Sequence, residues 1–316
     1  MNTFKALVKR EYLDGKNGYL YVPVILALLM LGITTIAVLG SGHILEINGV
    51  MVDGQEAGKY NLAEMIEHVK SSKEAEDLPA AVAILYWGLG ILVWVAFPFV
   101  VFFSLLGSLY EERRDRSILF WKSMPTSDVQ EVLAKLFMSV IGVFFIYLGV
   151  TIVLEIALAL ILGLTVLVQG GNMLDMWPVS YMVQGWIHAI PHYFLLALWA
   201  LPIFSWLMIV SAYAPRMTFM YAVLPPVVLI ILEEMLFGTA RIAHWIGTHI
   251  LGWLDGVDWR HFEGDVDGPK ELFSRIHEMP LWDMVVMSVT DLSFWSGVVL
   301  SGLFIYGAIE LRKRAI

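Results

Sequence analysis

The apolar residues of this chain come in long runs, and these runs define the architecture that we expect. A helix needs about 20 mostly apolar residues to cross a bilayer. Six stretches meet that length, namely residues 19–39, 81–109, 137–166, 187–212, 219–238 and 287–309. The second and third are longer than a crossing requires, so we expect them to tilt or to extend beyond the bilayer. The pattern predicts an all-α membrane protein with six transmembrane helices in a single domain.

Shorter amphipathic patterns occupy the two long segments between spans, residues 40–80 and 239–286. Leu62, Met65, Ile66 and Val69 repeat at the spacing of one helix face, which predicts a surface helix. A second apolar set begins at Ile242 and contains tryptophans and histidines, which favours an interfacial helix over a span. A third helix is expected around residues 272–276.

Composition and charge agree with this topology. The chain is 59% hydrophobic and 16% charged, whereas a soluble domain averages about 45–50% and 25%. Thirteen of the twenty lysines and arginines fall at the two termini or in the connections 110–136 and 213–218. Because short basic connections stay in the cytoplasm, we expect both termini there. The opposite segments are acidic, which suits either a solvated outer face or attraction of cationic substrates.

Several classes of chemistry are excluded. The chain has no cysteine, so disulfides and thiolate sites are absent. The run 19–39 is longer than the roughly 7–15 apolar residues of a signal peptide, so we interpret it as an uncleaved first span. No stretch completes the phosphate-binding pattern G-x-x-x-x-G-K-[ST]. If ATP powers this protein, another chain must bind it.

The loop 110–136 is the one polar segment that is bounded by two spans and is also rich in arginine. Acidic and basic residues alternate over 111–116, and a bulky apolar patch follows at 118–121. Ser127 and Gln130 match a capping box, which predicts a helix that starts here and continues into the third span. On spacing alone, the apolar patch fits the lipid headgroup region and a groove on a cytoplasmic subunit equally well.

This loop resembles the cytoplasmic loop of ABC-2-type transporter permeases, the membrane subunits of bacterial ABC exporters. The matching positions are Glu112, Arg114, Ser117, Ile118, Pro125, Ser127, Leu133 and Lys135. Residues 6–12 also resemble that family's amphipathic helix ahead of the first span. The match departs at Arg116-Ser117, where the family often has Gly-Thr, and this difference could alter the turn.

The resemblance implies partners and a location. It implies an ATP-binding cassette subunit that carries ATP and magnesium, a second permease copy as homodimer or related heterodimer, contact with membrane lipids, and no nucleic acid. It places the chain in the bacterial inner membrane as a non-enzymatic subunit that exports a substrate by alternating access. The docking role carries over to Glu112, Arg113, Arg114, Phe120, Trp121 and Pro125.

Three carboxylates fall within or at the ends of spans: Glu155, Glu233 and Glu234. A charge at the bilayer centre costs about 2.5–3.5 kcal/mol on insertion scales, so such residues are candidates for a transport pathway. The alternative is a protonated glutamate that bonds to a neighbouring helix. Glu155 also leaves open a proton-coupled transporter.

Two further alternatives remain at this point. The chain could be a binding or regulatory membrane protein that does not transport. It could also be an intramembrane metalloprotease that uses Glu233, Glu234, His244 and His249, although no H-E-x-x-H pattern is present. His188 and His192 stand four apart, but two ligands fall short of a closed metal site. We therefore expect no metal.

Overall fold

The computed structural model describes residues 3–40, 51–52, 55–56, 61–72, 74–251, 268–277 and 281–315. Much of the two acidic outer segments lies outside these residues. Within them the chain is helical, apart from an antiparallel hairpin of β1 (Met51–Val52) and β2 (Gln55–Glu56). The expected all-α fold is therefore confirmed.

The elements follow one another along the chain as helices of very different length. The first half holds α1 (Thr3–Asp14), η1 (Asn17–Tyr21), α2 (Val22–Gly40), α3 (Leu62–Ser71), α4 (Leu78–Ser108), α5 (Tyr110–Arg114), α6 (Ile118–Lys122), α7 (Asp128–Phe137), η2 (Met138–Gly142) and α8 (Val143–Val168). The second half holds η3 (Met173–Met176), α9 (Val179–Trp199), α10 (Leu201–Tyr213), α11 (Thr218–Phe237), α12 (Arg241–Leu251), α13 (Pro269–His277), α14 (Leu281–Thr290) and α15 (Leu292–Arg314).

Among the described residues, five helical runs are long and apolar enough to cross a membrane. They are Asn17–Val38, Leu78–Arg114, Asp128–Val168, Thr218–Phe237 and Leu292–Arg314. A sixth crossing results if Met173–Trp199 and Leu201–Tyr213, which are bent by 57° relative to each other, form one span. The chain is thus a multi-pass membrane protein, and its described residues supply five candidate crossings, or six if the bent pair is one span.

Two span boundaries differ from the sequence expectation. The stretch 187–212 is not one straight helix, because it breaks between α9 and α10 at Ala200. Pro202 follows, and a proline has no N–H to continue the ladder and restricts the residue before it. The last span starts at Leu292 instead of residue 287, because Asp291 accepts a hydrogen bond from the Ser293 amide at 2.7 Å and caps α15.

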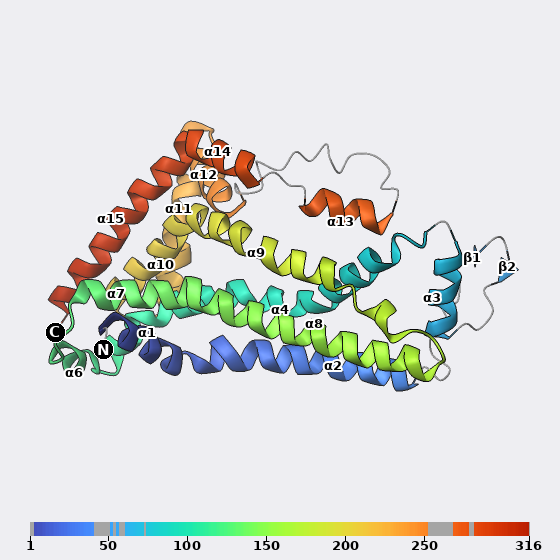
Figure 1. Ribbon diagram of the computed structural model, residues 1–316. Coiled ribbons are helices and arrows are strands. Elements are labelled where there is room, and N and C mark those ends of the chain that lie inside the picture. Colours follow the sequence, from blue (N-terminus) through green and yellow to red (C-terminus); the bar gives the residue numbers. More distant parts are fainter. Residues whose placement is uncertain are drawn as a thin grey trace.

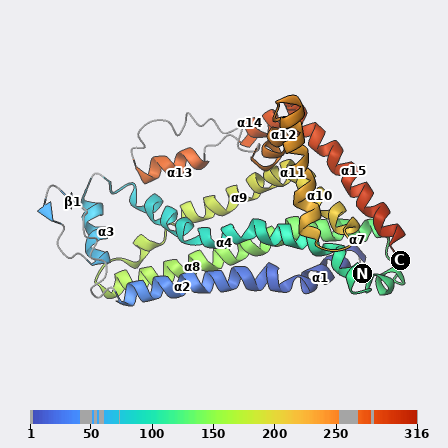
Figure 2. The ribbon, with the colours of Figure 1, turned by 180° about the vertical axis from the view of Figure 1, so that it is seen from behind.

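The long helices form an elongated bundle in which α2, α4 and α8 run beside one another (Figure 1). Both termini and α6 lie at one end of this bundle, and α3 and the hairpin lie at the other (Figures 1 and 2). The end that holds the termini is called the loop end below. Tyr86, Phe144, Tyr147 and Leu158 are among the fully buried side chains of the core.

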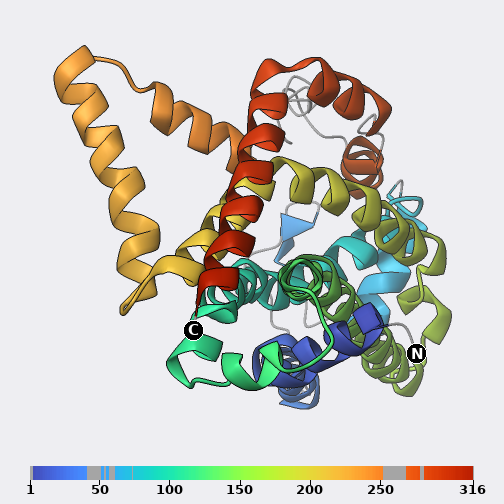
Figure 3. The ribbon, with the colours of Figure 1, turned by 90° about the vertical axis from the view of Figure 1, so that its left-hand side faces the viewer.

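Helix α11 stands away from the rest of the bundle (Figure 3). Most of its apolar side chains are exposed, including Met235 at 77% and Phe237 at 74%. Its described buried residues are only Ala222 and Glu233. An apolar helix with so little internal packing must meet lipid or another protein within the membrane.

The local helix signals in the sequence are confirmed. The Ser127 hydroxyl accepts a hydrogen bond from the Gln130 amide at 3.2 Å, the Gln130 side chain accepts from the Ser127 amide, and α7 continues through η2 into α8. The amphipathic pattern that starts at Leu62 forms α3, which has a capping box of its own. The second and third outer patterns form α12 and α13.

Arg116 adopts a left-handed conformation, with φ of 58°, in the turn between α5 and α6. That conformation favours glycine because a Cβ atom crowds the backbone there. Arg116 therefore carries backbone strain in this turn.

Candidate functional site

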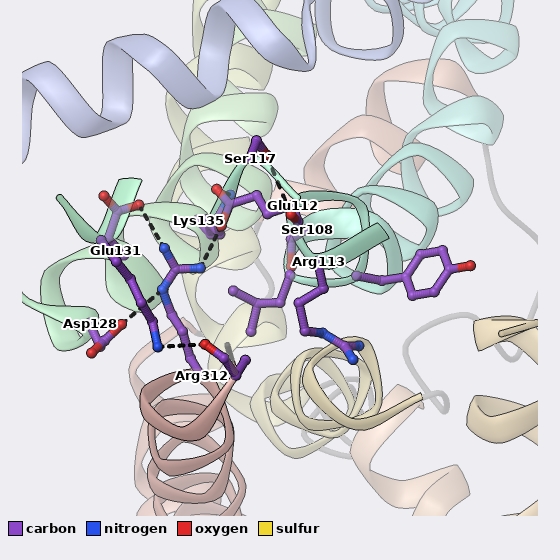
Figure 4. A network of polar contacts seen from close by, with 12 residues as sticks. Ser108, Glu112, Arg113, Ser117, Asp128, Glu131, Lys135 and Arg312 are labelled. Atoms are coloured by element: carbon purple, nitrogen blue, oxygen red, sulfur yellow. Dashed lines mark hydrogen bonds and ion pairs between the residues drawn. The ribbon is translucent and has the colours of Figure 1, made fainter. Parts of the chain in front are cut away.

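Seven charged side chains from four helices meet at the loop end and form what we call the ion cluster. Its members are Arg10 and Glu11 from α1, Glu112 from α5, Asp128, Glu131 and Lys135 from α7, and Arg312 from α15. Figure 4 shows Glu112 of α5, Glu131 and Lys135 of α7, and Arg312 of α15 converging. Amphipathic phasing positions the α7 residues, because Asp128, Glu131 and Lys135 follow a spacing of three and four.

Arg10 connects α1 to both arms of the loop. Its guanidinium binds Glu131 through two hydrogen bonds, at 3.2 and 2.7 Å, and Glu112 through one at 3.1 Å. It also donates to the adjacent Glu11 at 3.0 Å. The planar guanidinium suits this role, because it offers five donors in a fixed geometry.

Lys135 and Arg312 complete the ion cluster. The Lys135 ammonium donates to both oxygens of Glu11, at 3.0 and 2.9 Å, and lies 2.9 Å from Glu112. Arg312 donates to Glu112 from α15 and lies 3.2 Å from Asp128. Glu112 therefore contacts the three basic residues of the cluster.

The ion cluster is buried, which makes each of its members depend on the others. The side chains of Glu131 and Arg312 are each 2% exposed, and that of Lys135 is 4% exposed. Removing one partner from such a network leaves an uncompensated charge and typically costs about 3–5 kcal/mol. Burial alone would lower the pKa of Arg10, but the hydrogen bond to Glu131 and the charge of Glu11 outweigh it and raise that pKa.

The carboxylates of Glu11, Glu112 and Glu131 lie within 4.8 Å of one another, a spacing that could hold a metal ion. Arg10, Lys135 and Arg312 already occupy these oxygens. All three of these carboxylates are paired with basic side chains, so the arrangement is a salt-bridge network, in which Asp128 is the fourth acidic member.

A second set of bonds ties the loop to α10. The Ser211 hydroxyl accepts hydrogen bonds from the amides of Leu109 and Tyr110, each at 3.0 Å. In return Arg113 donates to the carbonyl groups of Ser211 at 2.6 Å and Ala214 at 2.9 Å. Arg113 thus satisfies carbonyl groups at the end of α10, which have no partner within their own helix.

The outward side of the loop end is apolar. Leu119 is 54% exposed, Phe120 is 59% exposed and Met124 is 44% exposed. Pro125 and Arg114 are exposed beside them. We call these five residues the α6 surface. It is held on its inner side by Lys122, which donates to the carbonyl groups of Lys313 at 2.9 Å and Ala315 at 2.6 Å.

The six residues expected to dock a partner therefore fall into two groups. Arg114, Phe120 and Pro125 are exposed on the α6 surface. Glu112 and Arg113 are bonded within the chain. Trp121 lies between the groups, half-buried beneath Arg10, whose guanidinium carbon is 4.1 Å from its ring centroid.

The three carboxylates associated with the spans have different surroundings. Glu155 is 1% exposed in α8 and accepts a hydrogen bond from the Trp186 indole at 2.7 Å. Glu233 accepts from the Thr239 hydroxyl and from the amides of Arg241 and Ile242, at 2.7 to 2.8 Å, and so caps the start of α12. Glu234 is exposed.

The histidines do not join these carboxylates. His249 is 1% exposed and packs against Trp245 and Trp199, with ring centroids 3.9 and 5.6 Å away. His244 is exposed on α12. In the part of the chain that the structure describes, Glu233, Glu234, His244 and His249 do not form a set with metal-ligand spacing. The rings of His188 and His192 lie 6.4 Å apart.

Of the ion cluster, the sequence reasoning named only Glu112 as a site residue. Arg10, Lys135 and Arg312 were counted as markers of orientation, and Lys135 also as a position of the loop resemblance. The available signal was the phase of α7, since Glu131 and Lys135 share the buried side of that helix with Val132. Charges at such positions must be paired.

Comparison with protein-family models, with curated proteins and with solved structures yields no match.

Proposed function

We propose that this chain is the membrane subunit of an ATP-driven exporter of the ABC-2 type. A separate ATP-binding cassette subunit would bind and hydrolyse ATP. This chain would move the substrate across a bacterial inner membrane by alternating between two states, with the loop end in the cytoplasm. The proposal joins the resemblance in the loop to the multi-pass fold.

The observation that carries the proposal is the pairing of the ion cluster with the α6 surface. The cluster joins the loop to α1, to α7 and to α15 through buried charges. The α6 surface presents exposed apolar side chains on the same loop. A rigid attachment behind an exposed apolar face is what a force-transmitting contact requires.

Movement of the α6 surface would pass into the bundle along two routes. Through Glu112 and the ion cluster it would reach α7, which continues without interruption into α8. Through Arg113 and Ser211 it would reach α10, which packs against α15. In this mechanism Glu112 and Arg113 transmit the movement, and Phe120, Trp121 and Pro125 meet the partner.

A second copy of the permease, or a related one, belongs to the proposal. Helix α11 offers the largest apolar face that the described bundle leaves uncovered. A homodimer or heterodimer would place two α6 surfaces on the same side of the membrane, as two ATP-binding subunits require.

Co-purification tests the docking step. Leu119→Glu and Phe120→Glu each place a charge in the expected apolar contact. In detergent, each variant of this chain should therefore fail to co-purify with the ATP-binding subunit. Gln130→Glu is a matched control. It adds the same charge at the same end of the bundle and keeps the capping box, which accepts either residue. Retention of the subunit by both α6 variants would contradict the proposal.

ATP hydrolysis separates transport from mere association. If the complex forms, reconstitution in lipid vesicles should show hydrolysis that responds to an exported substrate. Formation of the complex without such a response to any tested substrate would favour a binding or regulatory membrane protein.

A further inference from the structure

A stripe of polar side chains crosses the apolar core on one side of α8. Tyr147, Thr151 and Glu155 are spaced four residues apart, so they lie on the same face of the helix. All three are buried, at 0%, 5% and 1% exposed. The stripe spans about 12 Å along the helix axis. Polar residues at such depth are rare and mark functional sites by default.

Glu155, at one end of the stripe, forms no ion pair with any residue that the structure describes. Its carboxylate accepts one hydrogen bond, from the Trp186 indole of α9 at 2.7 Å. In the described residues, the ionisable side chains on the helices around α8 are Tyr19 and Tyr21 of η1, Glu64, Glu67, His68 and Lys70 of α3, Tyr86 of α4, Asp175 of η3, and Tyr181, His188, His192 and Tyr193 of α9. None of these forms an ion pair with Glu155.

The other two members of the stripe have unused hydrogen-bonding capacity. The Tyr147 hydroxyl and the Thr151 hydroxyl are buried, and neither has a hydrogen-bond partner among the described residues. Buried polar groups without partners are exceptional in native proteins and point to a bound species. Long side chains on a helix lean toward its N-terminus, which here is the loop end.

Three more hydroxyl groups lie toward the loop end, and the first of them, on Ser139, is eight residues before Tyr147. Ser139 of η2 lies 2.7 Å from Ser104 of α4, and Tyr19 of η1 contacts Ser104 through its hydroxyl. Tyr19 and Ser104 line a cavity of about 620 Å³ between η1, α4 and α5. That cavity is also lined by Glu111 and Asp115, which are exposed.

We propose that Glu155 is a proton-binding site inside the membrane, reached from this cavity along the hydroxyl stripe. A proton from water in the cavity would bind a carboxylate oxygen of Glu155 and give a neutral carboxyl group. The Trp186 indole would still donate to Oε2, and the added proton would sit on the other carboxyl oxygen, Oε1. Release of the proton reverses the step.

The chemistry of the site supports the neutral form. An ionised carboxylate in apolar surroundings is costly unless it is paired with a cation, and one indole donor does not supply that charge. Loss of the proton would therefore favour a movement that brings water or donors to Glu155. Because the indole belongs to α9, protonation would control the contact between α8 and α9. This inference is independent of the proposed ATP-driven export.

Difference infrared spectroscopy of the full chain in lipid vesicles tests the site. In the spectrum at neutral pH minus the spectrum at alkaline pH, the wild type should show the carbonyl band of a protonated carboxyl group. Glu155→Gln should remove that band. Glu234→Gln is the matched control, because it deletes an exposed carboxylate and should leave the band unchanged. An unchanged band in Glu155→Gln at every pH would overturn the proposal.

A second variant keeps the test valid if Glu155→Gln fails to fold. Trp186→Phe retains the carboxyl group and removes its donor, so the band should shift in frequency. Absence of a shift would show that the band does not arise from Glu155.

Hydrogen–deuterium exchange tests the route. Thr151→Val and Tyr147→Phe remove one hydroxyl each with little change in shape, and each should slow exchange of the Glu155 carboxyl proton after transfer to heavy water. Thr165→Val is the control on the same helix, since the Thr165 hydroxyl bonds to the Ile161 carbonyl group of its own helix. Equal exchange rates in all three variants and the wild type would overturn the proposed path.

Discussion

The Lys135 ammonium donates to both carboxylate oxygens of Glu11, at 3.0 and 2.9 Å, although 124 residues separate them. Both side chains are buried, at 4% and 8% exposed. The contact fastens the N-terminal helix α1 to α7 and therefore to the long helix α8. Together with the bonds from Arg10 to Glu131, it joins α1 to α7 without any side chain of α5 or α15.

Replacing Lys135 by methionine should destabilise the protein strongly. The variant keeps most of the volume and leaves Glu11 and Glu112 short of a cation, which should cost about 3–5 kcal/mol of the free energy of unfolding. Unfolding in detergent measures the effect. Arg114→Met is the control. It breaks the exposed pair with Asp115, which should cost at most about 1 kcal/mol. Equal losses would mean that the ion cluster is not buried as described.

At position 116, glycine should give a more stable protein than alanine, which is the reverse of the usual order in a helix. The φ of 58° at Arg116 disfavours any residue with a Cβ atom by about 1–2 kcal/mol. The free energy of unfolding of Arg116→Gly should therefore exceed that of Arg116→Ala by about 1 kcal/mol, as measured by thermal unfolding. In a helical segment alanine is normally the more stabilising of the two residues. A more stable alanine variant would exclude the left-handed turn.

Gly297 and Gly302 form a matched pair on α15. A Cβ atom at Gly297 would lie 2.2 Å from Nε2 of His249, a ring held between two tryptophans, whereas nothing lies within 4 Å of one at Gly302. Gly297→Ala should cost about 1–3 kcal/mol through overpacking. Gly302→Ala should be neutral or stabilising by up to about 1 kcal/mol. The thermal unfolding midpoints of the two variants measure this difference. Similar midpoints would contradict the contact between α12 and α15.

Asp14 should make the fold less stable as pH rises. Partial burial, and then the neighbouring Glu11 carboxylate, raise the pKa of Asp14 above its ordinary value. A raised pKa in the folded state contributes stability that is complete below the unfolded pKa of about 3.9 and is lost as pH rises through the folded pKa. Asp14→Asn should therefore match the wild type in acid and exceed it at neutral pH.

Thermal unfolding between about pH 4 and pH 8 measures the difference for Asp14→Asn. The guanidinium of Arg10 should stay paired in Asp14→Asn, because it keeps its bonds to Glu112 and Glu131. A lower midpoint for the variant at neutral pH would show that the contact with Arg10, at 3.8 Å, outweighs the repulsion.

Features of the fold that depend on nearby residues could be predicted from the sequence. Ser127 and Gln130 are three positions apart, so the start of α7 was visible as a local pattern. The amphipathic repeat from Leu62 predicted α3 for the same reason. Long apolar runs predicted the spans, because the bilayer sets their length.

Features that depend on distant partners could not be predicted in this way. Glu112 looked like a surface charge in a polar loop, and its partners Arg10 and Arg312 lie 102 and 200 residues away. The break between α9 and α10 at Ala200 could not be predicted either, because a proline within a span is compatible with both a kink and a continuous helix. Pro98 lies inside the continuous helix α4, whereas Pro202 follows a bend of 57°.

The ion cluster gives the last helix a part in the order of assembly. Chains emerge from the ribosome with the N-terminus first, so the four acidic residues of the cluster enter the folding bundle with only Arg10 and Lys135 to balance them. Arg312 arrives with α15 and brings the third positive charge. Until α15 packs, Glu112 lacks one of its cations and the ion cluster holds four negative charges against two positive ones. Packing of α15 and ordering of the loop 110–136 are thus coupled through Arg312. Folding intermediates in which α15 has not packed should therefore have a loop that proteases cleave.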